Sequence, residues 1–406
     1  MKFKLLSLIV AFMMVFTFTL PCLAIESSES AGKNLTANPS PSLTTQETLV
    51  KSYVDSYGHW NEWYTYYASS VQDMYFMLVR NPVSRANKTG VLAVDSAELL
   101  YIEKVDNSYA PFYPELSEYM AQENNYECYL AGIDMTVTSD SQYYYDGINY
   151  KLIVIVYENG EWKIGAQCGA PVELIADVDG TVETDEALMF YAEKAGISFD
   201  TNSTYGVGWG FIGADLNNPP EEITVGNGYG YINDNGKWTA GINGQPFVID
   251  FRNYIYNATA NEVYETYHED AIKACAVAIK MYAWWCHLGT YREALGCDLL
   301  VNFDQAYDAS ETSYPNSVTE AVDDIINYYI VSGSNLGSNS GKLFSTCCNN
   351  FTQYDVPYSG NLVQSGAQNL ALNYDQSWQQ IVHYYFDNTT FNSTNTGVVQ
   401  IGTHTW

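Results

Sequence analysis

The sequence predicts an α+β protein with more than one domain, and three features support this. The chain has 406 residues, which is long for a single hydrophobic core. Residues 97–164 contain alternating and β-branched runs separated by turn residues, as antiparallel strands do. Residues 271–285 are almost entirely apolar and lack Pro, which indicates a buried helix. We expect a cone-shaped helix-plus-antiparallel-sheet domain, followed by an α/β domain with a buried central helix.

Residues 1–24 have the pattern of a secretory signal peptide. A positively charged start precedes an apolar stretch over residues 5–20, and a small-residue cleavage site follows. A transmembrane anchor is the alternative, but the apolar stretch is short and is followed by Pro21. We expect an exported protein without stable membrane insertion after signal removal, and a flexible linker over residues 25–44.

Charge and composition limit the partners. The formal net charge of −30 disfavours nucleic acid, whose phosphates would repel the protein, and also disfavours electrostatic binding to anionic wall polymers. The 36 Tyr residues favour neutral polar and aromatic surfaces, which suit carbohydrate. Tyr in ordinary β-sheets is the alternative explanation.

Residues 45–170 form the expected first domain. Its elements are one or two helices over residues 45–78, strands over residues 97–105, 126–138 and 150–157, and a tight turn at Asn159-Gly160 leading into residues 162–164. This order resembles the nuclear-transport-factor-2-like (cystatin-like) domains that precede many cell-wall domains. The predicted pocket has no paired His and Asp, so we expect a targeting or packing role there instead of catalysis.

Residues 171–220 are expected to be a connector, residues 221–390 a second domain, and residues 391–406 a tail that is loose or forms a late strand. The expected second-domain elements are a strand over residues 223–225, a hairpin with Asn235-Gly236 and Asn243-Gly244, the central helix, a helix over residues 318–327, a hairpin of residues 328–331 with 342–346, and a helix over residues 377–386.

Glu262 is the first candidate catalytic residue. It precedes the central helix, for which Thr266 and Glu269 are spaced as a capping box. Tyr264 and Tyr267 follow it closely in the sequence. A carboxyl beside apolar rings tends to have a raised pKa, as a general acid needs. An exposed glutamate in a loop is the alternative.

The second domain contains three motifs in a defined order. The first comprises Glu262, Asp270-Ala271-Ile272-Lys273-Ala274, Ala276-Val277-Ala278 and Lys280-Met281-Tyr282-Ala283, the second Phe303-Asp304-Gln305-Ala306-Tyr307, and the third Gln364-Ser365-Gly366-Ala367-Gln368 with residues 377–385. In the type and order of these motifs the domain resembles the SpoIID/LytB family of sporulation and cell-wall proteins, and the likeness covers roughly the last 185 residues.

The resemblance implies a bacterial cell-wall protein that acts on peptidoglycan glycan strands as a lytic transglycosylase, or that enhances a separate N-acetylmuramoyl amidase. In the first case Glu262 would protonate the glycosidic oxygen and then, as a base, deprotonate the muramic 6-hydroxyl, which closes on the anomeric carbon. Hydrolysis by a carboxylate pair would need a second Asp or Glu, for which Asp304 is the candidate. Asp304 as a structural partner is the alternative.

Four other residues are candidates for contacts with substrate. Lys280 could support the departing charge or orient Glu262, and a buried Lys in a salt bridge is equally consistent with its position. Tyr282, Tyr307 and Gln364 are candidates for hydrogen bonds to the sugar.

The sequence also departs from the family pattern. Many members have Gly-His-Gly-x-Gly where this chain has Pro357-Tyr358-Ser359-Gly360-Asn361, and the usual Ser-Gln-Tyr is here Val363-Gln364-Ser365. If the replaced residues hold the glycan, the protein binds the wall without cutting it. A non-catalytic, amidase-enhancing protein therefore stays open as the second hypothesis.

Seven cysteines remain after the predicted signal peptide, so at least one thiol is unpaired. Cys128 could pair with Cys168, and Cys286 with Cys297. A zinc site formed by the adjacent residues 347–348 and a His is conceivable, but the chain has no CxxC spacing, so we expect no cofactor.

Overall fold

The computed structural model describes residues 43–406 except 111–113, 172–173, 176–177, 179–218, 233–237, 243, 290–291, 334–342, 351 and 390–395. The described residues from Leu43 to Trp406 belong to one compact unit. The predicted signal peptide, most of the linker and most of the connector lie outside the described residues, as does Asn235-Gly236.

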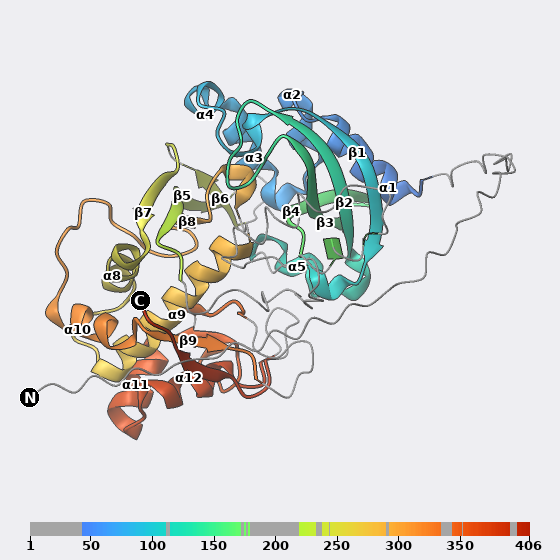
Figure 1. Ribbon diagram of the computed structural model, residues 1–406. Helices are drawn as coiled ribbons and strands as arrows, with labels where there is room; N and C mark the ends of the chain where they lie inside the picture. Colours follow the sequence, from blue (N-terminus) through green and yellow to red (C-terminus); the bar gives the residue numbers. More distant parts are fainter. Residues whose placement is uncertain are drawn as a thin grey trace, which may run out of the picture. The chain divides into compact units, whose positions relative to one another are not determined.

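The predicted mixture of helices and antiparallel sheets is confirmed (Figure 1). The segment before residue 170 contains more and shorter helices than the sequence predicts. They are α1 (Thr45–Asp55), α2 (Trp60–Trp63), the 3-10 helix η1 (Tyr64–Tyr66), α3 (Ser69–Arg80), α4 (Pro82–Ala86) and α5 (Ser117–Met120). The capping box of α1 is formed by Thr44 and Glu47.

A four-stranded antiparallel sheet follows in the order β1-β2-β3-β4. Its strands are β1 (Val94–Val105), β2 (Tyr126–Val137), β3 (Gly147–Glu158) and β4 (Glu161–Gly169), so the predicted strands are confirmed. Asn159 and Gly160 have φ values of 52° and 92°, as the predicted two-residue hairpin turn requires.

The second half contains a mixed sheet in the order β6-β5-β7, with β8 paired in parallel to β5. Its strands are β5 (Glu222–Ile232), β6 (Trp238–Ile242), β7 (Phe247–Asp250) and β8 (Leu299–Val301). The helices are α8 (Phe251–Glu262), α9 (Glu269–Gly289), η6 (Glu293–Leu295), α10 (Asn316–Ile325), α11 (Gln364–Tyr374) and α12 (Trp378–Phe386). Neither β8 nor α11 was predicted.

The predicted hairpin of residues 328–331 with 342–346 is wrong. β9 (Tyr328–Val331) instead pairs antiparallel with β12 (Gln400–Thr403), so the tail supplies its partner strand. Residues 343–346 have no regular structure, and β10 (Cys347–Asn349) pairs in parallel with β11 (Asn361–Val363). An apolar run cannot specify its partner strand, since many runs satisfy the same alternation.

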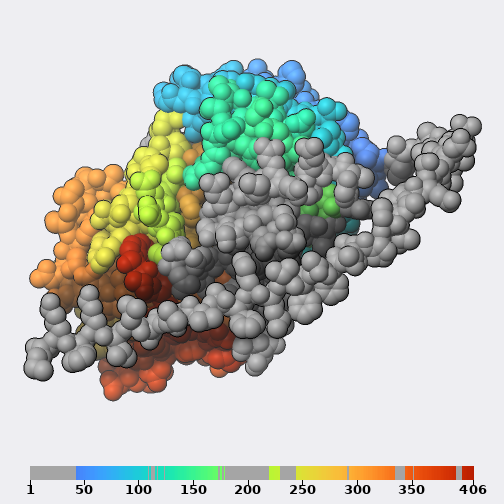
Figure 2. Space-filling model, in the orientation of Figure 1, coloured from blue at the N-terminus to red at the C-terminus, as the bar shows by residue number. Residues whose placement is uncertain are grey.

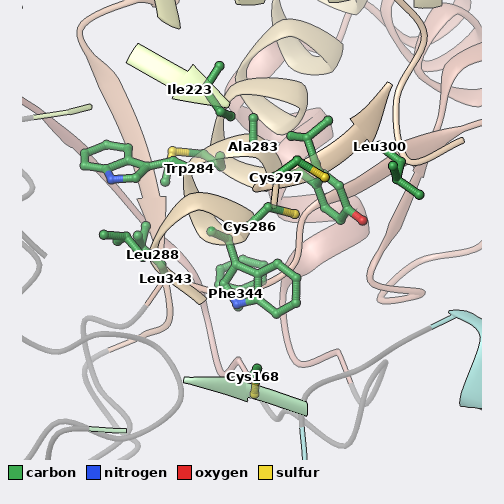
Figure 3. Packing of buried hydrophobic residues seen from close by; sticks show 14 of the residues in the cluster. Cys168, Ile223, Ala283, Trp284, Cys286, Leu288, Cys297, Leu300, Leu343 and Phe344 are labelled. Carbon is green, nitrogen blue, oxygen red and sulfur yellow. The ribbon is translucent and has the colours of Figure 1, made fainter. Parts of the chain in front are cut away.

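α9 is the central helix of the second half, as predicted, and it contacts α8, α10, α11 and α12 (Figure 1). Almost every residue from Ala271 onward is buried, and Figure 3 shows Trp284 and Cys286 among apolar side chains of neighbouring segments. The predicted capping box is wrong, because the helix begins at Glu269 and not at residue 267. His268 precedes it, and its Nδ1 accepts the N–H of Asp270 at 3.3 Å.

Polar contacts join the first helices to the β5–β7 sheet. The side-chain amide of Gln245 donates to Ser84 Oγ at 3.0 Å, and Gln245 also accepts from Thr89. Figure 2 shows the light-blue surface around α4 beside the yellow surface of these strands. Among the described helices, none combines the length and apolar character needed to cross a membrane.

Candidate functional site

α8 presents Glu262 at its last position. Asp250 caps the start of the helix by accepting the N–H of Asn253 at 2.8 Å. Tyr254, Ala258 and Glu262 are spaced four residues apart, so they lie along one face of the helix. That face meets the loop that follows β8.

The Glu262 carboxyl accepts a hydrogen bond on each oxygen. The main-chain N–H of Ala306 donates to Oε1 at 2.6 Å, and the Gln364 side-chain amide donates to Oε2 at 2.8 Å. The first, second and third motifs of the sequence therefore meet at one carboxyl, although they are separated by tens of residues. Its direction is fixed from two sides, and neither donor carries a formal charge.

The environment of Glu262 acts on its acidity in two opposing ways. Burial raises the pKa of the carboxyl, while the hydrogen bonds from Ala306 and Gln364 lower it, and the net shift is upward. In the described part of the chain, no Lys, Arg or His forms an ion pair with Glu262. The predicted direction of the shift therefore agrees with the structure, and its cause is desolvation.

The rings that surround this carboxyl are not those expected from the sequence. The Tyr264 side chain is 68% exposed, and its ring contacts Tyr267 at a centroid distance of 5.5 Å. Tyr254, about two turns earlier on the same face of α8, is fully buried, and its pKa is raised by burial and additionally by the charges of Cys286 and Glu262. Tyr254 stacks on Tyr307 at 5.9 Å with an interplanar angle of 12°.

The loop after β8 is shaped by Asn302 and Asp304. Asn302 has a φ of 67°, a left-handed conformation that Asn tolerates better than most residues, and its Oδ1 accepts the Tyr307 N–H at 3.2 Å. Asp304 accepts the Leu300 N–H at 2.7 Å and forms an ion pair with Arg292 at 2.8 Å. The Asp304 side chain is 1% exposed, so the structure places it as a loop anchor.

Two further contacts lock this loop against the helices. The hydroxyl of Tyr254 donates to Gln305 Oε1, and Gln305 Nε2 donates to the Ile279 carbonyl of α9 at 3.0 Å. Asn257 of α8 binds both the N–H of Asp308 and its carbonyl, at 2.9 and 2.7 Å. The Ala306 N–H is thereby held over the end of α8.

Gln364 is positioned by the packing of α11. It follows β11 directly and is only 1% exposed. Two residues later, a Cβ on Gly366 would collide with the Asp355 carboxylate and the Tyr385 hydroxyl, which are themselves hydrogen-bonded at 2.6 Å. The Gly of this motif therefore permits close packing, and the buried amide of Gln364 contacts Glu262 and not solvent.

Lys280 and Tyr282 lie elsewhere. Lys280 is fully buried, and its Nζ donates to the carbonyls of Ile326 and Tyr328, both at 2.6 Å, and lies 2.9 Å from His404 Nε2. Burial lowers the pKa of Lys280 to about 7. Tyr282 is 6% exposed and its ring contacts Trp285. The Lys280 contacts join α9 to the start of β9 and to His404 near the end of the chain.

A second polar cluster fills the space between the first helices and the β1–β4 sheet. Glu293 of η6 forms a fully buried ion pair with Lys151 of β3 at 2.9 Å and accepts from the Gln167 amide of β4 at 3.0 Å. The hydroxyls of Tyr53 and Tyr57 in turn donate to Gln167. A side chain from the second half therefore occupies the polar interior of the first.

The described cysteines, 128, 168, 275, 286, 297, 347 and 348, are all free thiols, so neither suggested disulfide is present. β3 separates Cys128 on β2 from Cys168 on β4, and this distance cannot be bridged. Within the described residues, the structure has no group of three or more His, Cys, Asp or Glu side chains arranged for a metal ion.

Sequence reasoning missed the Ala306 N–H, Tyr254 and Asn257. The N–H belongs to the main chain and has no signal in the side-chain pattern. Tyr254 had one, because a spacing of eight residues before Glu262 places it near the same helical face once residues 251–262 are assigned to a helix, whereas Asn257, five residues before Glu262, lies on another face and had none.

Comparisons with known proteins do not extend this description, because neither the family models nor the curated proteins that were searched contain a match to the chain.

Proposed function

We propose that the protein is an exported cell-wall protein that acts on peptidoglycan glycan strands as a SpoIID-like lytic transglycosylase with Glu262 as its catalytic residue. The observation that carries this proposal is the convergence of the Ala306 N–H and the Gln364 amide on the two oxygens of Glu262. Three sequence motifs that resemble the family thus serve one carboxyl.

The chemistry asked of Glu262 fits its surroundings. Desolvation favours the protonated form, so the carboxyl can donate to the glycosidic oxygen between N-acetylmuramic acid and N-acetylglucosamine. After the bond breaks, the carboxylate is stabilised by its two N–H donors and accepts the proton of the muramic 6-hydroxyl. That oxygen closes on the anomeric carbon to give an anhydro end, and Glu262 returns to its protonated form.

The placement of Asp304 favours this route over hydrolysis. A paired-carboxylate hydrolase needs a second carboxylate that faces the scissile bond. Asp304 is instead buried and holds Arg292 and the Leu300 N–H. An intramolecular hydroxyl replaces the water that such a carboxylate would activate.

In this proposal the remaining candidates have different roles. Gln364 is a positioning residue, since its buried amide orients Glu262. Tyr307 is the retained candidate for a sugar contact, because it is half-buried beside Tyr254. Lys280 and Tyr282 are left out of the substrate set because both are buried. The first half, with its helices and antiparallel sheet, is proposed to be a nuclear-transport-factor-2-like cone packed against a SpoIID-like α/β domain.

Peptide-free glycan strands provide the test. Wild-type protein should release anhydro-muramic ends, detectable by mass spectrometry, and Glu262→Gln should abolish their release. Glu265→Gln is a matched control, because Glu265 lies three residues away and is exposed. Anhydro ends produced equally by wild type and Glu262→Gln would refute Glu262 as the catalytic residue.

The alternative is a non-catalytic peptidoglycan-binding protein that enhances an amidase. It is favoured by the hydrogen bond that each Glu262 oxygen already accepts from the protein itself. The same experiment distinguishes the two functions. Retention on purified sacculi without anhydro products, in wild type and variant alike, supports the binder.

A further inference from the structure

The first half contains a surface pocket that has no part in the Glu262 site. Its volume is about 530 Å³, within the range of small-molecule sites. Its lining includes Tyr66 and Trp162, the hydroxyls of Thr45 and Thr65, and the charged pair Glu161 and Lys163. These residues come from α1, η1 and β4, so three elements converge on it.

The two aromatic side chains are held in place by neighbouring rings. Trp162 contacts Tyr157 edge-on at 5.3 Å, across the β3–β4 hairpin. Tyr66 contacts Tyr53 edge-on at 6.4 Å, and its hydroxyl donates to Glu62 at 3.3 Å. Both rings are half-buried, so part of each is available to a ligand. Rigid aromatic rings in a partly open pocket can bind an apolar ligand face at low entropic cost.

The polar groups favour an uncharged ligand. Lys163 and Glu161 form an ion pair at 3.1 Å, so the charges that line the pocket cancel. The formal net charge of the whole protein, −30, disfavours binding of an anionic ligand. Thr45 and Thr65 are exposed. The Thr65 hydroxyl donates to the Glu62 carbonyl at 2.6 Å and can still accept a hydrogen bond from a ligand, as can the Thr45 hydroxyl.

We propose that this pocket binds a neutral pyranose ring of a glycan, with Trp162 and Tyr66 against the C–H face of the sugar and Thr45 and Thr65 near its hydroxyls. A pyranose combines an apolar face with a hydroxyl-rich rim, and the lining offers the complement of both. The assignment of that glycan to the cell wall rests on the proposed function. The pocket would then hold a strand at a second point while Glu262 acts on it.

Binding of the N-acetylglucosamine trimer, measured by isothermal titration calorimetry on the full chain, tests the proposal. Wild-type protein should bind the trimer, and Trp162→Ala should weaken binding at least tenfold. Thr65→Val keeps the size of an exposed side chain and should weaken binding two- to fivefold. It therefore tests the pocket even if the Trp162→Ala variant fails to fold. Tyr374→Ala removes a 66% exposed ring far along the chain and serves as the control.

Two results would overturn the pocket: no binding by wild type, or affinities of Trp162→Ala and Thr65→Val within twofold of the control. The outcome is separable from that of the cleavage assay. Release of anhydro ends without Trp162-dependent trimer binding refutes the pocket and leaves the proposed function standing. Trp162-dependent binding of the trimer without Glu262-dependent release of anhydro ends supports the pocket and refutes the proposed function.

Discussion

Replacing Gln364 by Met isolates one of the two hydrogen bonds that hold Glu262. The amide of Gln364 donates to Oε2 at 2.8 Å and is buried, so the variant deletes the donor without opening a wide path for water. Met is similar in length and flexible enough to fill the space. Because the hydrogen bond stabilises the ionised form, its loss should raise the pKa of Glu262 further.

The expected size follows from the type of hydrogen bond. A hydrogen bond to a charged group contributes about 1.5–3 kcal/mol. Glu262 is itself partly exposed, so water can compensate for part of the loss, and the lower end of that range applies. A change of about 1.4 kcal/mol corresponds to about a tenfold higher proton affinity of the carboxyl.

Carbon-13 NMR of Glu side-chain carboxyls, assigned with Glu262→Gln, measures that affinity directly. Gln368→Met is the matched control, because Gln368 lies one turn along the same helix and binds the His268 N–H instead. The midpoint for Glu262 should rise in Gln364→Met and stay unchanged in the control. An unchanged or lower midpoint in Gln364→Met would show that the amide does not set the acidity of this carboxyl.

Three further predictions concern the stability of the fold. Lys151→Met should lower the free energy of unfolding, measured in urea, by about 3–5 kcal/mol, because it leaves the charge of Glu293 buried without its partner. The double variant Lys151→Met/Glu293→Leu should recover most of this loss. A loss below about 1 kcal/mol in the single variant would contradict the reasoning. Folded Glu262 has the higher pKa, so the folded state binds more protons than the unfolded state and wild-type stability falls as pH rises from the unfolded pKa through the folded one. Glu262→Gln should therefore melt at a higher temperature than wild type at pH 8, with a smaller difference near pH 4; a difference that grows on acidification would reverse the assigned direction. Gly366→Ala should cost about 1–3 kcal/mol by collision with Tyr385, and equal urea midpoints for variant and wild type would show that α11 can move away.

Local signals in the sequence predicted the elements that depend on neighbouring residues. The Asn159-Gly160 turn and the helix predicted over residues 377–386, observed as α12, are examples, since short-range sterics and hydrogen bonds determine the turn and the start of the helix. The pairing of Tyr328 with Thr403 was not predictable in the same way. Those residues lie far apart in the chain, and only the packing of the whole unit selects the partner.

The site shows the same division between residue type and placement. Glu262, Tyr307 and Gln364 were candidates because their chemistry suits a sugar, and two of them meet in the structure. Asp304 has the chemistry of a catalytic carboxylate, but its ion pair with Arg292 gives it an anchoring position. A sequence specifies which groups can ionise, whereas neighbours distant in the chain decide whether they face solvent, substrate or each other.

Glu262 must both give and take a proton in the proposed reaction, and its two opposing influences are suited to that alternation. Burial without the two N–H donors would raise the pKa further and make the protonated carboxyl a weaker acid toward the leaving oxygen in the first step. The donors without burial would lower the pKa and leave a carboxylate that is too weak as a base for the second step. With both present, each form is disfavoured by one influence and favoured by the other. The loop anchored by Asp304 and the close packing at Gly366 therefore affect the reaction through this balance, although neither residue touches the sugar in the proposal.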